Sequence, residues 1–511
     1  MYDIAALYEA GSVPEAVSLR LAHPDAQIIA GGSDVLVQVR EGRRAGKELI
    51  SLYGLDALRG VTLDADGALR IGSLTSFSHI TRHPLIQRYC MALGEAVDQV
   101  GSPQIRNIGT IGGNTCNGVT SADSASTLFA WDALIELTGK NGVRRVPVAK
   151  FYLGPGKVDI RAEDGEIETA VLIPRESYEN TWGCYQKYGM RNAMEIATLG
   201  CSVNVRLSSG GQVIERCRIA YGVAGPVPLR CPTAEAAVNG KSCTEADMAA
   251  LSEVFSHAVL SDIRPRDSWR ASKAFREQIA VEFAKRGLVE AVRRARTAME
   301  KGEQSAQTEA AKTFNSIPDS VQDVSTPSSI PGAPASIFRA PAYKLIRFRL
   351  NGKPVEKMTD VRSSLTDLLR LSCHCTSVKK GCEVGECGAC TVLIDGEAFN
   401  SCIYLAVWAE GKDVRTLEGL LGTDGELSDL QKAFVEEAAI QCGFCTPGFL
   451  MTASEILDAK TLYTDDQLRR LLSGHLCRCT GYENILRAVR KAMYRNLGQE
   501  PPGSGEENGK E

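Results

Sequence analysis

The chain has 511 residues, of which 44% are hydrophobic and 23% are charged, and its formal net charge is −4. This composition is typical of a globular protein, and the length predicts three or four domains of about 150 residues each. The negative charge excludes a basic nucleic-acid surface, and no stretch approaches the roughly 20 apolar residues of a membrane span. No signal peptide is evident, and the many thiols favour a reducing cytoplasm.

The first 300 residues predict an α/β arrangement. A short apolar strand over 28–30 runs into Gly31 and Gly32, and further strands are predicted over 134–137 and 171–173. Between 195 and 223 the apolar residues alternate as in antiparallel strands, with a Gly-Gly turn at 210–211. The segment 271–296 predicts a helix that ends this half.

Two glycine loops are candidate phosphate-binding sites. One spans 30–34 after the first strand, and the other spans 110–114, with Asp123 downstream. Glycine lets backbone N–H groups approach a pyrophosphate. Neither loop matches G-x-G-x-x-G, which excludes a Rossmann fingerprint, and each alone is compatible with an ordinary turn. Gly240-Lys241-Ser242 resembles the end of a P-loop, but Glu235 stands where its first glycine belongs.

The composition changes between 301 and 341, where Ser, Gln, Thr, Ala and Pro dominate. Such a segment cannot bury much apolar surface, so it predicts a flexible linker, and the polar tail predicts disorder. Beyond the linker, apolar residues alternate over 346–350 before Asn351-Gly352, the turn pair of a two-residue hairpin. A short helix over 364–370 follows, and this order favours a small β-grasp ferredoxin domain.

From residue 428 onward the apolar period becomes helical. Capping-box patterns begin at Ser428 and Thr464. Two apolar helix faces are predicted, formed by Leu468, Leu471, Leu472 and Leu476 and by Ile485, Val489 and Met493. A domain of packed helices is therefore expected at the end of the chain.

Eight cysteines in the last 140 residues form two sets of four. The first set is Cys382, Cys387, Cys390 and Cys402, and the second is Cys442, Cys445, Cys477 and Cys479. The first spacing is that of a plant-type [2Fe–2S] ferredoxin, in which soft thiolates complete sulfur coordination at two irons. Glycines in this loop permit positive φ and let backbone N–H groups reach the cluster. The second spacing alone is also compatible with zinc, although a neighbouring ferredoxin domain favours a second cluster.

The remaining cysteines carry no ligand pattern. Cys373 and Cys375 flank a histidine without further ligands, and we interpret them as buried or loop thiols. Seven scattered cysteines of the first half are interpreted as ordinary buried thiols, namely Cys90, Cys116, Cys184, Cys201, Cys217, Cys231 and Cys243. Two clusters on one chain indicate electron relay, and beside them the paired glycine loops favour a flavin.

These motifs resemble the molybdenum hydroxylases, and most closely the bacterial xanthine dehydrogenases whose flavin and iron–sulfur subunits are separate chains. Residues 1–296 resemble the flavin subunit, including the runs 187–194 and 221–226, and residues 343–496 resemble the iron–sulfur subunit. The resemblance implies a multidomain α+β protein. Its order would be a vanillyl-alcohol-oxidase-like FAD-binding domain, an α+β flavoprotein C-terminal domain, a β-grasp plant-type ferredoxin domain and a four-helix [2Fe–2S] domain.

The resemblance also predicts domain boundaries. They are 1–176 for the FAD-binding domain, 177–297 for the flavoprotein C-terminal domain, 298–342 for the linker, 343–422 for the ferredoxin domain, 423–497 for the helical domain and 498–511 for the tail.

The cofactor-binding positions are carried over from the family residue by residue. FAD would contact a first segment, a second segment, one aspartate and two bordering positions: Gln27, Ile28, Ile29, Ala30, Gly31, Gly32, Ser33 and Asp34; Gly109, Thr110, Ile111, Gly112, Gly113 and Asn114; Asp123; and Ile167 and Lys187. Ser33 and Gly109 replace the more usual Thr and Ala, which are small changes. Gln441 matches a glutamine that contacts the pterin of a large partner subunit.

The implied function is electron transfer. No part of the chain resembles the large molybdopterin-binding catalytic subunit, so molybdenum and all catalytic residues would lie on that partner. Electrons from xanthine would pass through the helical cluster, the plant-type cluster and FAD to NAD+. The expected assembly is a cytoplasmic dimer of heterodimers in purine catabolism, without nucleic acid or membrane partners. The alternatives are a nicotinate, aldehyde or other N-heterocycle hydroxylase and, from a different class, a zinc-stabilised binding scaffold.

Overall fold

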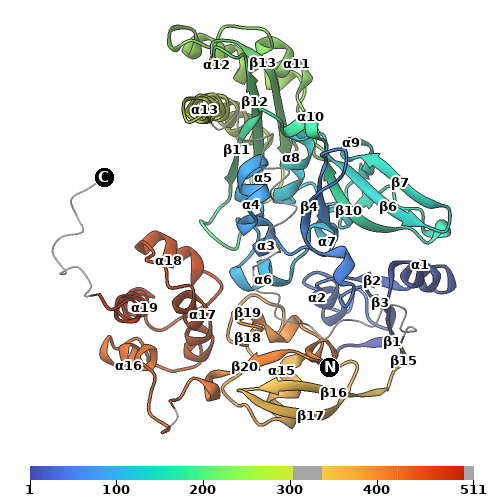
Figure 1. The fold of residues 1–511 in the computed structure, drawn as a ribbon, viewed down its shortest axis with the longest axis vertical. Helices are drawn as coiled ribbons and strands as arrows, with labels where there is room; N and C mark the ends of the chain where they lie inside the picture. The colour runs from blue at the N-terminus through green and yellow to red at the C-terminus, as the bar shows by residue number, and fades with distance from the viewer. Residues whose placement is uncertain (303–335, 423, 500–511) are drawn as a thin grey trace.

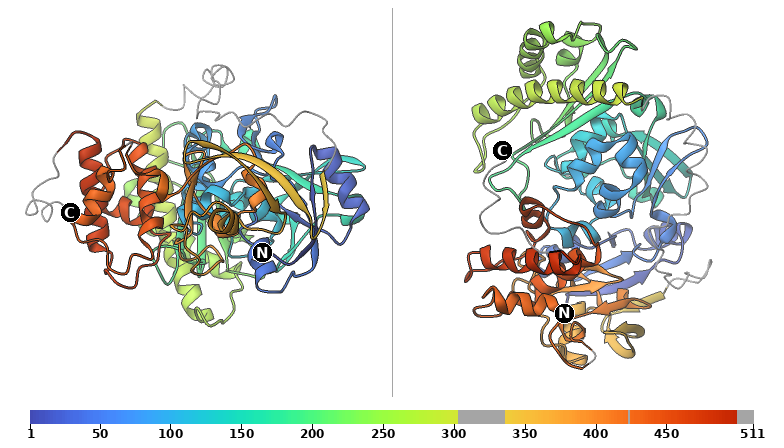
Figure 2. Two further views of the ribbon diagram at one scale, coloured as in Figure 1. Left: turned by 90° about the horizontal axis from the view of Figure 1, so that it is seen from below. Right: turned by 60° about the vertical axis from the view of Figure 1, so that its left-hand side comes forward.

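The structure is a computed structural model that describes residues 1–302, 336–422 and 424–499 (Figure 1). We call residues 1–302 the N-terminal half and residues 336–499 the C-terminal half. The two halves lie against each other, and the C-terminal half covers one end of the N-terminal half (Figures 1 and 2).

The first domain contains two main sheets. The strands of the first sheet are β1 (Ile4–Glu9), β2 (Gln27–Ile29), β3 (Lys47–Ser51) and β15 (Ser336–Arg339). Its order is β15-β1-β3-β2, with β1, β3 and β2 parallel and β15 antiparallel to β1. The second sheet is antiparallel and contains, in spatial order, β4 (Val61–Leu63), β5 (Leu69–Gly72), β10 (Ile167–Ile173), β6 (Leu134–Gly139) and β7 (Gly142–Pro147).

Short helices connect and cover these sheets. They are α1 (Val13–Ala22), α2 (Val35–Arg40), α3 (Phe77–Arg82), α4 (Pro84–Tyr89), α5 (Met91–Val97), α6 (Pro103–Ile108), α7 (Ile111–Cys116), α8 (Asp123–Ala130), α9 (Val148–Phe151) and α10 (Arg175–Tyr178). A small hairpin of β8 (Tyr152–Gly154) and β9 (Lys157–Val158) follows α9. The strands predicted over 134–137 and 171–173 are confirmed as parts of β6 and β10, and the strand predicted over 28–30 is confirmed as β2, which ends one residue earlier at Ile29.

The second domain is one antiparallel sheet covered by helices. Its strands, in order, are β11 (Trp182–Tyr188), β12 (Leu199–Leu207), β13 (Ile214–Gly222) and β14 (Leu229–Arg230). Its helices are α11 (Pro232–Val238), α12 (Glu245–Ala258) and α13 (Lys273–Glu300). The predicted turn between β12 and β13 is confirmed, and Gly211 has a φ of +66° that favours glycine.

The C-terminal half begins with a small mixed sheet. Its strands, in spatial order, are β17 (Lys353–Asp360), β16 (Tyr343–Leu350), β20 (Asp413–Arg415), β18 (Thr391–Ile394) and β19 (Glu397–Asn400). Asn351 and Gly352 have φ of +51° and +78°, which confirms the predicted hairpin. The predicted helix after it is α15 (Leu365–Asp367), which continues as a π-helical turn over Leu368–Ser372.

Four helices complete the part of the chain that the structure describes: α16 (Asp429–Glu436), α17 (Thr446–Asp458), α18 (Asp465–Leu471) and α19 (Glu483–Asn496). Both predicted capping boxes are present, at Ser428 and Thr464. The predicted helix face is wrong for Leu476, because α18 ends at Leu471 and the Leu476 side chain is 49% exposed. The Leu476 N–H instead donates to the Cys387 carbonyl at 3.1 Å, so this segment forms a contact between the two cysteine loops.

The predicted linker, 298–342, is too wide at both ends. Helix α13 continues to Glu300, since Ala298 is buried against the second domain. Strand β15 lies within the other end of the predicted linker, where it pairs antiparallel with β1 at the edge of the first sheet. Most of the predicted linker and the predicted tail lie outside the described residues.

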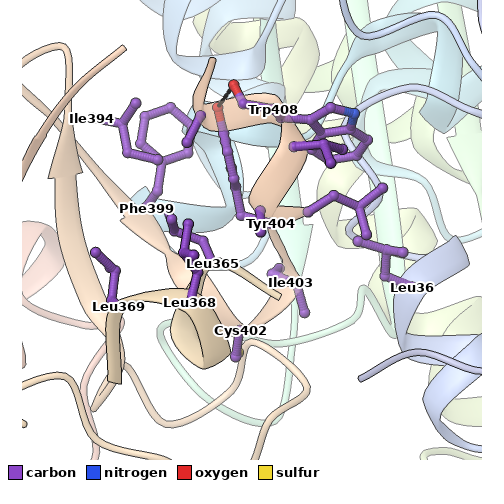
Figure 3. Close-up of a cluster of buried hydrophobic side chains, with 14 of the residues drawn as sticks. Leu36, Leu365, Leu368, Leu369, Ile394, Phe399, Cys402, Ile403, Tyr404 and Trp408 are labelled. Atoms are coloured by element: carbon purple, nitrogen blue, oxygen red, sulfur yellow. Dashed lines mark hydrogen bonds between the residues drawn. The ribbon is translucent and has the colours of Figure 1, made fainter. Parts of the chain in front are cut away.

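The interface between the halves has a buried aromatic centre. Trp408 stacks on Tyr53 with ring centroids 4.4 Å apart and donates its indole N–H to Ser51 Oγ at 3.2 Å. Tyr404 contacts Tyr53 with the two hydroxyl oxygens 3.0 Å apart. Figure 3 shows Leu36 of the N-terminal half beside this cluster, which is one continuous apolar core across both halves. Among the described residues, no helix combines the length and apolar character that a bilayer crossing requires.

We predict that Trp408→Ala destabilises the protein by about 3 to 5 kcal/mol, because it removes a buried ring from the junction of the halves. Trp269→Ala is the matched control, since Trp269 is 77% exposed, and it should change stability by about 0.5 kcal/mol or less. Urea unfolding followed by intrinsic fluorescence checks this, and equal midpoints for the two variants would refute the interface described above.

Candidate functional site

The first glycine loop lies at the junction of the two halves. It follows β2 and leads into α2, and Gly32 has a φ of +77°. A Cβ on Gly31 would lie 1.7 Å from the Ile108 carbonyl oxygen, so this glycine is required by close packing. The backbone N–H groups over 31–34 have no hydrogen-bond acceptor within the described chain. Unpaired N–H groups in succession form a cradle that a phosphate can fill.

The second glycine loop is satisfied by the protein itself. Thr110 caps α7, and its Oγ1 accepts the Gly113 N–H at 3.1 Å. The Gly112 N–H donates to the Ser73 carbonyl at 2.8 Å, and a Cβ on Gly112 would lie 2.6 Å from the Ser73 Cβ. Free backbone N–H groups are therefore found in the first loop, whereas the second loop is built by close packing. Asn114 Oδ1 then accepts the Ser124 hydroxyl at 2.6 Å, which ties this loop to α8.

Asp123 and Lys187 form a buried ion pair between the first and second domains. Their charged atoms are 2.8 Å apart, and each side chain is 7% exposed. Asp123 also accepts the Tyr185 hydroxyl at 2.6 Å. Burial raises the pKa of Asp123, and the Lys187 charge opposes that shift. Tyr185 was missed from sequence, although it lies two residues before Lys187 and so on the same face of β11.

Ile167 joins the apolar cluster that also contains Ile28 and Ala30, so it lies behind the first loop. The next residue, Glu168, is buried beneath α7. The Thr115 hydroxyl lies 2.8 and 2.7 Å from the two Glu168 oxygens and also 3.1 and 3.0 Å from two backbone carbonyls. One hydroxyl proton cannot serve four acceptors, so a protonated Glu168 that donates to Thr115 satisfies this group best. In agreement, burial raises the pKa of Glu168 to about 8.

Three cysteines of the first set lie in the tight loop that leads into β18, and Cys402 follows β19. The Cys382 sulfur accepts backbone N–H groups from Val384, Glu386 and Cys387 at 3.5, 3.2 and 3.3 Å. Gly385 and Gly388 have φ of +79° and +70°, as predicted. Hydrogen bonds from the Cys387 and Cys402 thiols and from the backbone lower the pKa of Cys382, against the effect of burial. Amide donors around thiolates are the environment that an iron–sulfur cluster requires.

The second set lies at helix ends, as predicted. Cys445 caps α17, and Cys477 and Cys479 precede α19. The four sulfurs form two pairs, since Cys479 and Cys442 are 3.5 Å apart and Cys477 shares a hydrogen bond with Cys445. Cys442 and Cys479 are exposed, whereas the other pair is buried. Two thiols for each of two metals fit a [2Fe–2S] cluster.

The two cysteine loops touch each other and the N-terminal half. A Cβ on Gly388 would lie 2.2 Å from the Gly474 carbonyl oxygen, so the loops pack backbone against backbone. Gln104 of α6 reaches this point, with its Nε2 2.8 Å from His475 Nε2 and 3.2 Å from Thr452 Oγ1. Burial lowers the pKa of His475 to about 3, so this histidine is neutral. Sequence reasoning missed Gln104 and His475 because no local pattern relates them.

The other thiols are structural. Cys373 and Cys375 pack in or against the core shared by both halves, consistent with the interpretation as buried or loop thiols. Of the scattered cysteines, Cys116 is only partly exposed rather than buried and donates to Glu168 at 3.2 Å. The other six are buried. Gln441 lies on the surface beside exposed Cys442.

Three protein families match successive parts of the chain. The FAD-binding domain in molybdopterin dehydrogenase matches residues 3–176, the CO dehydrogenase flavoprotein C-terminal domain matches residues 184–291, and the [2Fe-2S] binding domain matches residues 416–490. The fold and the two cysteine sets thus define an iron–sulfur flavoprotein. The last match argues against the zinc alternative for the second set.

Similar proteins extend these matches. The putative xanthine dehydrogenase FAD-binding subunit XdhB of Escherichia coli K12 is 40% identical over 292 residues, 57% of this chain and 97% of that protein. The xanthine dehydrogenase iron–sulfur-binding subunit of Escherichia coli O157:H7 is 49% identical over 146 residues, 28% of this chain and 91% of that protein. The nicotine 6-hydroxylase small subunit of Paenarthrobacter nicotinovorans is 48% identical over 147 residues, 29% of this chain and 88% of that protein.

A solved structure agrees with the fold. A chain of carbon monoxide dehydrogenase from Hydrogenophaga pseudoflava aligns with a TM-score of 0.53 and 28% identity, over 58% of this chain and 99% of that one. The chain belongs to the molybdenum hydroxylase family, as a flavin part and an iron–sulfur part joined in one polypeptide, and its cofactors are FAD and two [2Fe–2S] clusters.

We predict that Cys477→Ser removes the helical-domain cluster and leaves the plant-type cluster and FAD in place, because the two sets occupy separate loops. Iron should fall from four to two atoms per chain, as each [2Fe–2S] cluster holds two. Cys375→Ser is the matched control and should keep all four. Iron and sulfide analysis with flavin release checks this. Stoichiometric zinc, or loss of all three cofactors together, would contradict it.

We predict that Glu168→Gln weakens the pH dependence of stability between about pH 5 and 8. The folded protein holds the Glu168 proton up to about pH 8, whereas the unfolded chain releases it near 4.5. The wild-type protein therefore loses stability as the pH rises through this window, with a slope of about 1.4 kcal/mol per pH unit at most. Glutamine keeps the donor and cannot ionise. Thermal melts at a fixed scan rate check this, with exposed Glu163→Gln as the control, which should follow the wild type.

Proposed function

We propose that this chain is the electron-transfer subunit of a xanthine dehydrogenase. Its N-terminal half is similar to a protein named as a xanthine dehydrogenase FAD-binding subunit, and its C-terminal half to one named as the iron–sulfur-binding subunit of such an enzyme. Similarity of both halves to subunits of the same enzyme supports this substrate over the others. When bound, the clusters supply one-electron transfer, and FAD supplies the change between one- and two-electron transfer.

The residues proposed to hold FAD form a continuous strip across the first two domains. The strip begins at the free N–H groups of 31–34, where Gly31 packs on Ile108, directly before the second segment. It continues to Asn114, which accepts a hydrogen bond from Ser124, and ends at the neighbouring Asp123 and its ion pair with Lys187. The first loop fits the pyrophosphate, because its donors are the ones that lack protein acceptors. The ion pair holds the two domains at a fixed spacing on either side of the strip. Ile28, Ile29, Ala30 and Ile167 support it from the core.

The observation that carries the proposal is the exposed face of the helical domain. Cys442 and Cys479 reach the surface there, next to Gln441. Large apolar side chains surround them, each more than 40% exposed: Ile440, Phe444, Leu476 and Tyr482. Exposed apolar residues gathered around a redox centre mark a protein interface. We assign this face to a large molybdopterin-binding catalytic subunit, so that the second cysteine set lies nearest the partner.

The proposed reaction follows from this arrangement. The partner oxidises xanthine, and this chain passes the electrons to NAD+ in the cytoplasm, within a dimer of heterodimers. The residues of this chain bind and space the cofactors and exclude water between the halves. The nicotine 6-hydroxylase small subunit matches the C-terminal half nearly as well, which keeps another N-heterocycle as the second candidate substrate.

We predict that the chain alone oxidises NADH with an artificial electron acceptor and shows no xanthine turnover. Adding the catalytic subunit should restore xanthine-dependent NAD+ reduction. Gln441→Ala should slow the coupled reaction about tenfold, the effect of roughly 1.4 kcal/mol of lost interface positioning. The artificial-acceptor reaction should stay unchanged, because FAD lies in the other half.

Gln278→Ala, an exposed glutamine on α13, is the matched control and should leave both reactions as they are. Equal loss of both activities in Gln441→Ala would place the defect in folding. Xanthine turnover by the chain alone would overturn the assignment, and turnover of nicotine but not xanthine by the assembled enzyme would move it to the second candidate.

A further inference from the structure

Arg40 extends from the flavin-binding half to the plant-type cysteine loop. It is the last residue of α2, the helix that begins directly after the first glycine loop. Its guanidinium lies over the Tyr2 ring, 4.6 Å from the centroid, and its Nη1 is 3.2 Å from Glu383 Oε1. Glu383 follows the ligand Cys382, and the Tyr2 hydroxyl donates to the carbonyl of the ligand Cys402.

The Arg40 charge is only partly compensated. The side chain is 19% exposed, and its Nε and Nη2 atoms are buried without a hydrogen-bond partner in the described part of the chain. Burial lowers the pKa of Arg40, but hydrogen bonding to Tyr2 and the charges of Tyr2, Glu383 and Cys402 raise it overall. Arg40 is therefore a permanent cation at the edge of the plant-type cysteine loop.

Two further cations lie near this loop, and both pair with carboxylates. Lys380 Nζ is 2.6 Å from Asp367 and 3.2 Å from Glu383, and the terminal amine of Met1 is 3.2 Å from Asp367. With Arg40, three cations therefore face two carboxylates. Glu386 of the same loop is exposed, so solvent screens its charge. Arg40 is the least exposed of the three cations, at 19% against 37% for Lys380 and 58% for the Met1 amine, so solvent screens its charge least.

We propose that Arg40 is a redox-tuning residue that raises the reduction potential of the plant-type [2Fe–2S] cluster. Reduction adds one negative charge to a cluster, and a fixed cation nearby stabilises the reduced form, more strongly where burial keeps the effective dielectric low. The helical-domain set has two exposed thiols, and Arg478, the cation between its last two cysteines, is exposed to solvent. This inference rests on the proposed electron-transfer function.

The test is a redox titration of the full-length chain followed by EPR, in which the two reduced clusters give separate signals. Arg40→Gln should lower the midpoint of the plant-type cluster, with about a tenfold change in its oxidised-to-reduced ratio at fixed potential, or about 59 mV. The helical-domain cluster should not move. Arg40→Lys keeps the charge and should restore most of the wild-type midpoint. Arg43→Gln, an exposed arginine three residues away, removes the same charge and should move neither cluster.

The possible outcomes distinguish an effect of the Arg40 charge from an effect of the substitution on the structure. An unchanged midpoint in Arg40→Gln, equal shifts of both clusters, or the same shift in Arg40→Lys would overturn the inference. Iron and flavin content show whether each variant assembles. If Arg40→Gln fails to assemble, Glu383→Gln takes its place, because removing the carboxylate should shift the same cluster upward, and a downward shift or none would count against Arg40. These titrations need neither partner nor substrate, so their failure is distinct from failure of the proposed function.

Discussion

The packing of Trp408 against the first glycine loop joins the two halves of this protein. A Cβ on Gly32 would lie 3.2 Å from the Trp408 ring, so the cofactor loop and the ferredoxin domain are in contact. Electrons pass between cofactors only over short distances, which requires their binding loops to meet at one interface. Trp408, Tyr53 and Tyr404 make that interface a continuous core instead of a surface contact. The relative position of the halves is thus set by burial of apolar surface, the strongest non-directional force available.

Glycine has the same role at three places where backbones meet. Gly31 packs on Ile108, Gly112 on Ser73, and Gly388 on Gly474, and a Cβ at any of these would fall closer than 3 Å to its neighbour. The contact of Gly31 with Ile108 brings the first glycine loop to the start of the second FAD segment. The contact of Gly388 with Gly474 joins the two cysteine loops across a domain boundary. Flexibility and phosphate approach are the usual reasons for such glycines, but here close packing explains three of them.

Charge also crosses the boundary between the halves. Arg40 and the Met1 amine reach the ferredoxin domain, while Lys344 returns an ion pair to Glu9 at 2.6 Å. Buried or half-buried ions are costly to leave unpaired, so these contacts select one arrangement of the halves. Strand β15 adds backbone hydrogen bonds to the same boundary. A chain that carries both halves can therefore place groups of one half in the electrostatic environment of the other.

The amino-acid sequence by itself determined the local features: the two cysteine sets, the Asn351-Gly352 hairpin, both capping boxes and the strand before Gly31. Each depends on residues close together in the chain, so spacing and propensity suffice. Only the tertiary structure decided which thiols are exposed, that Leu476 leaves its predicted helix, and that β15 belongs to the first sheet. It alone brought Gln104 to His475 and Arg40 to Glu383. These are contacts between residues hundreds of positions apart, and such contacts follow from how cores pack rather than from any local pattern.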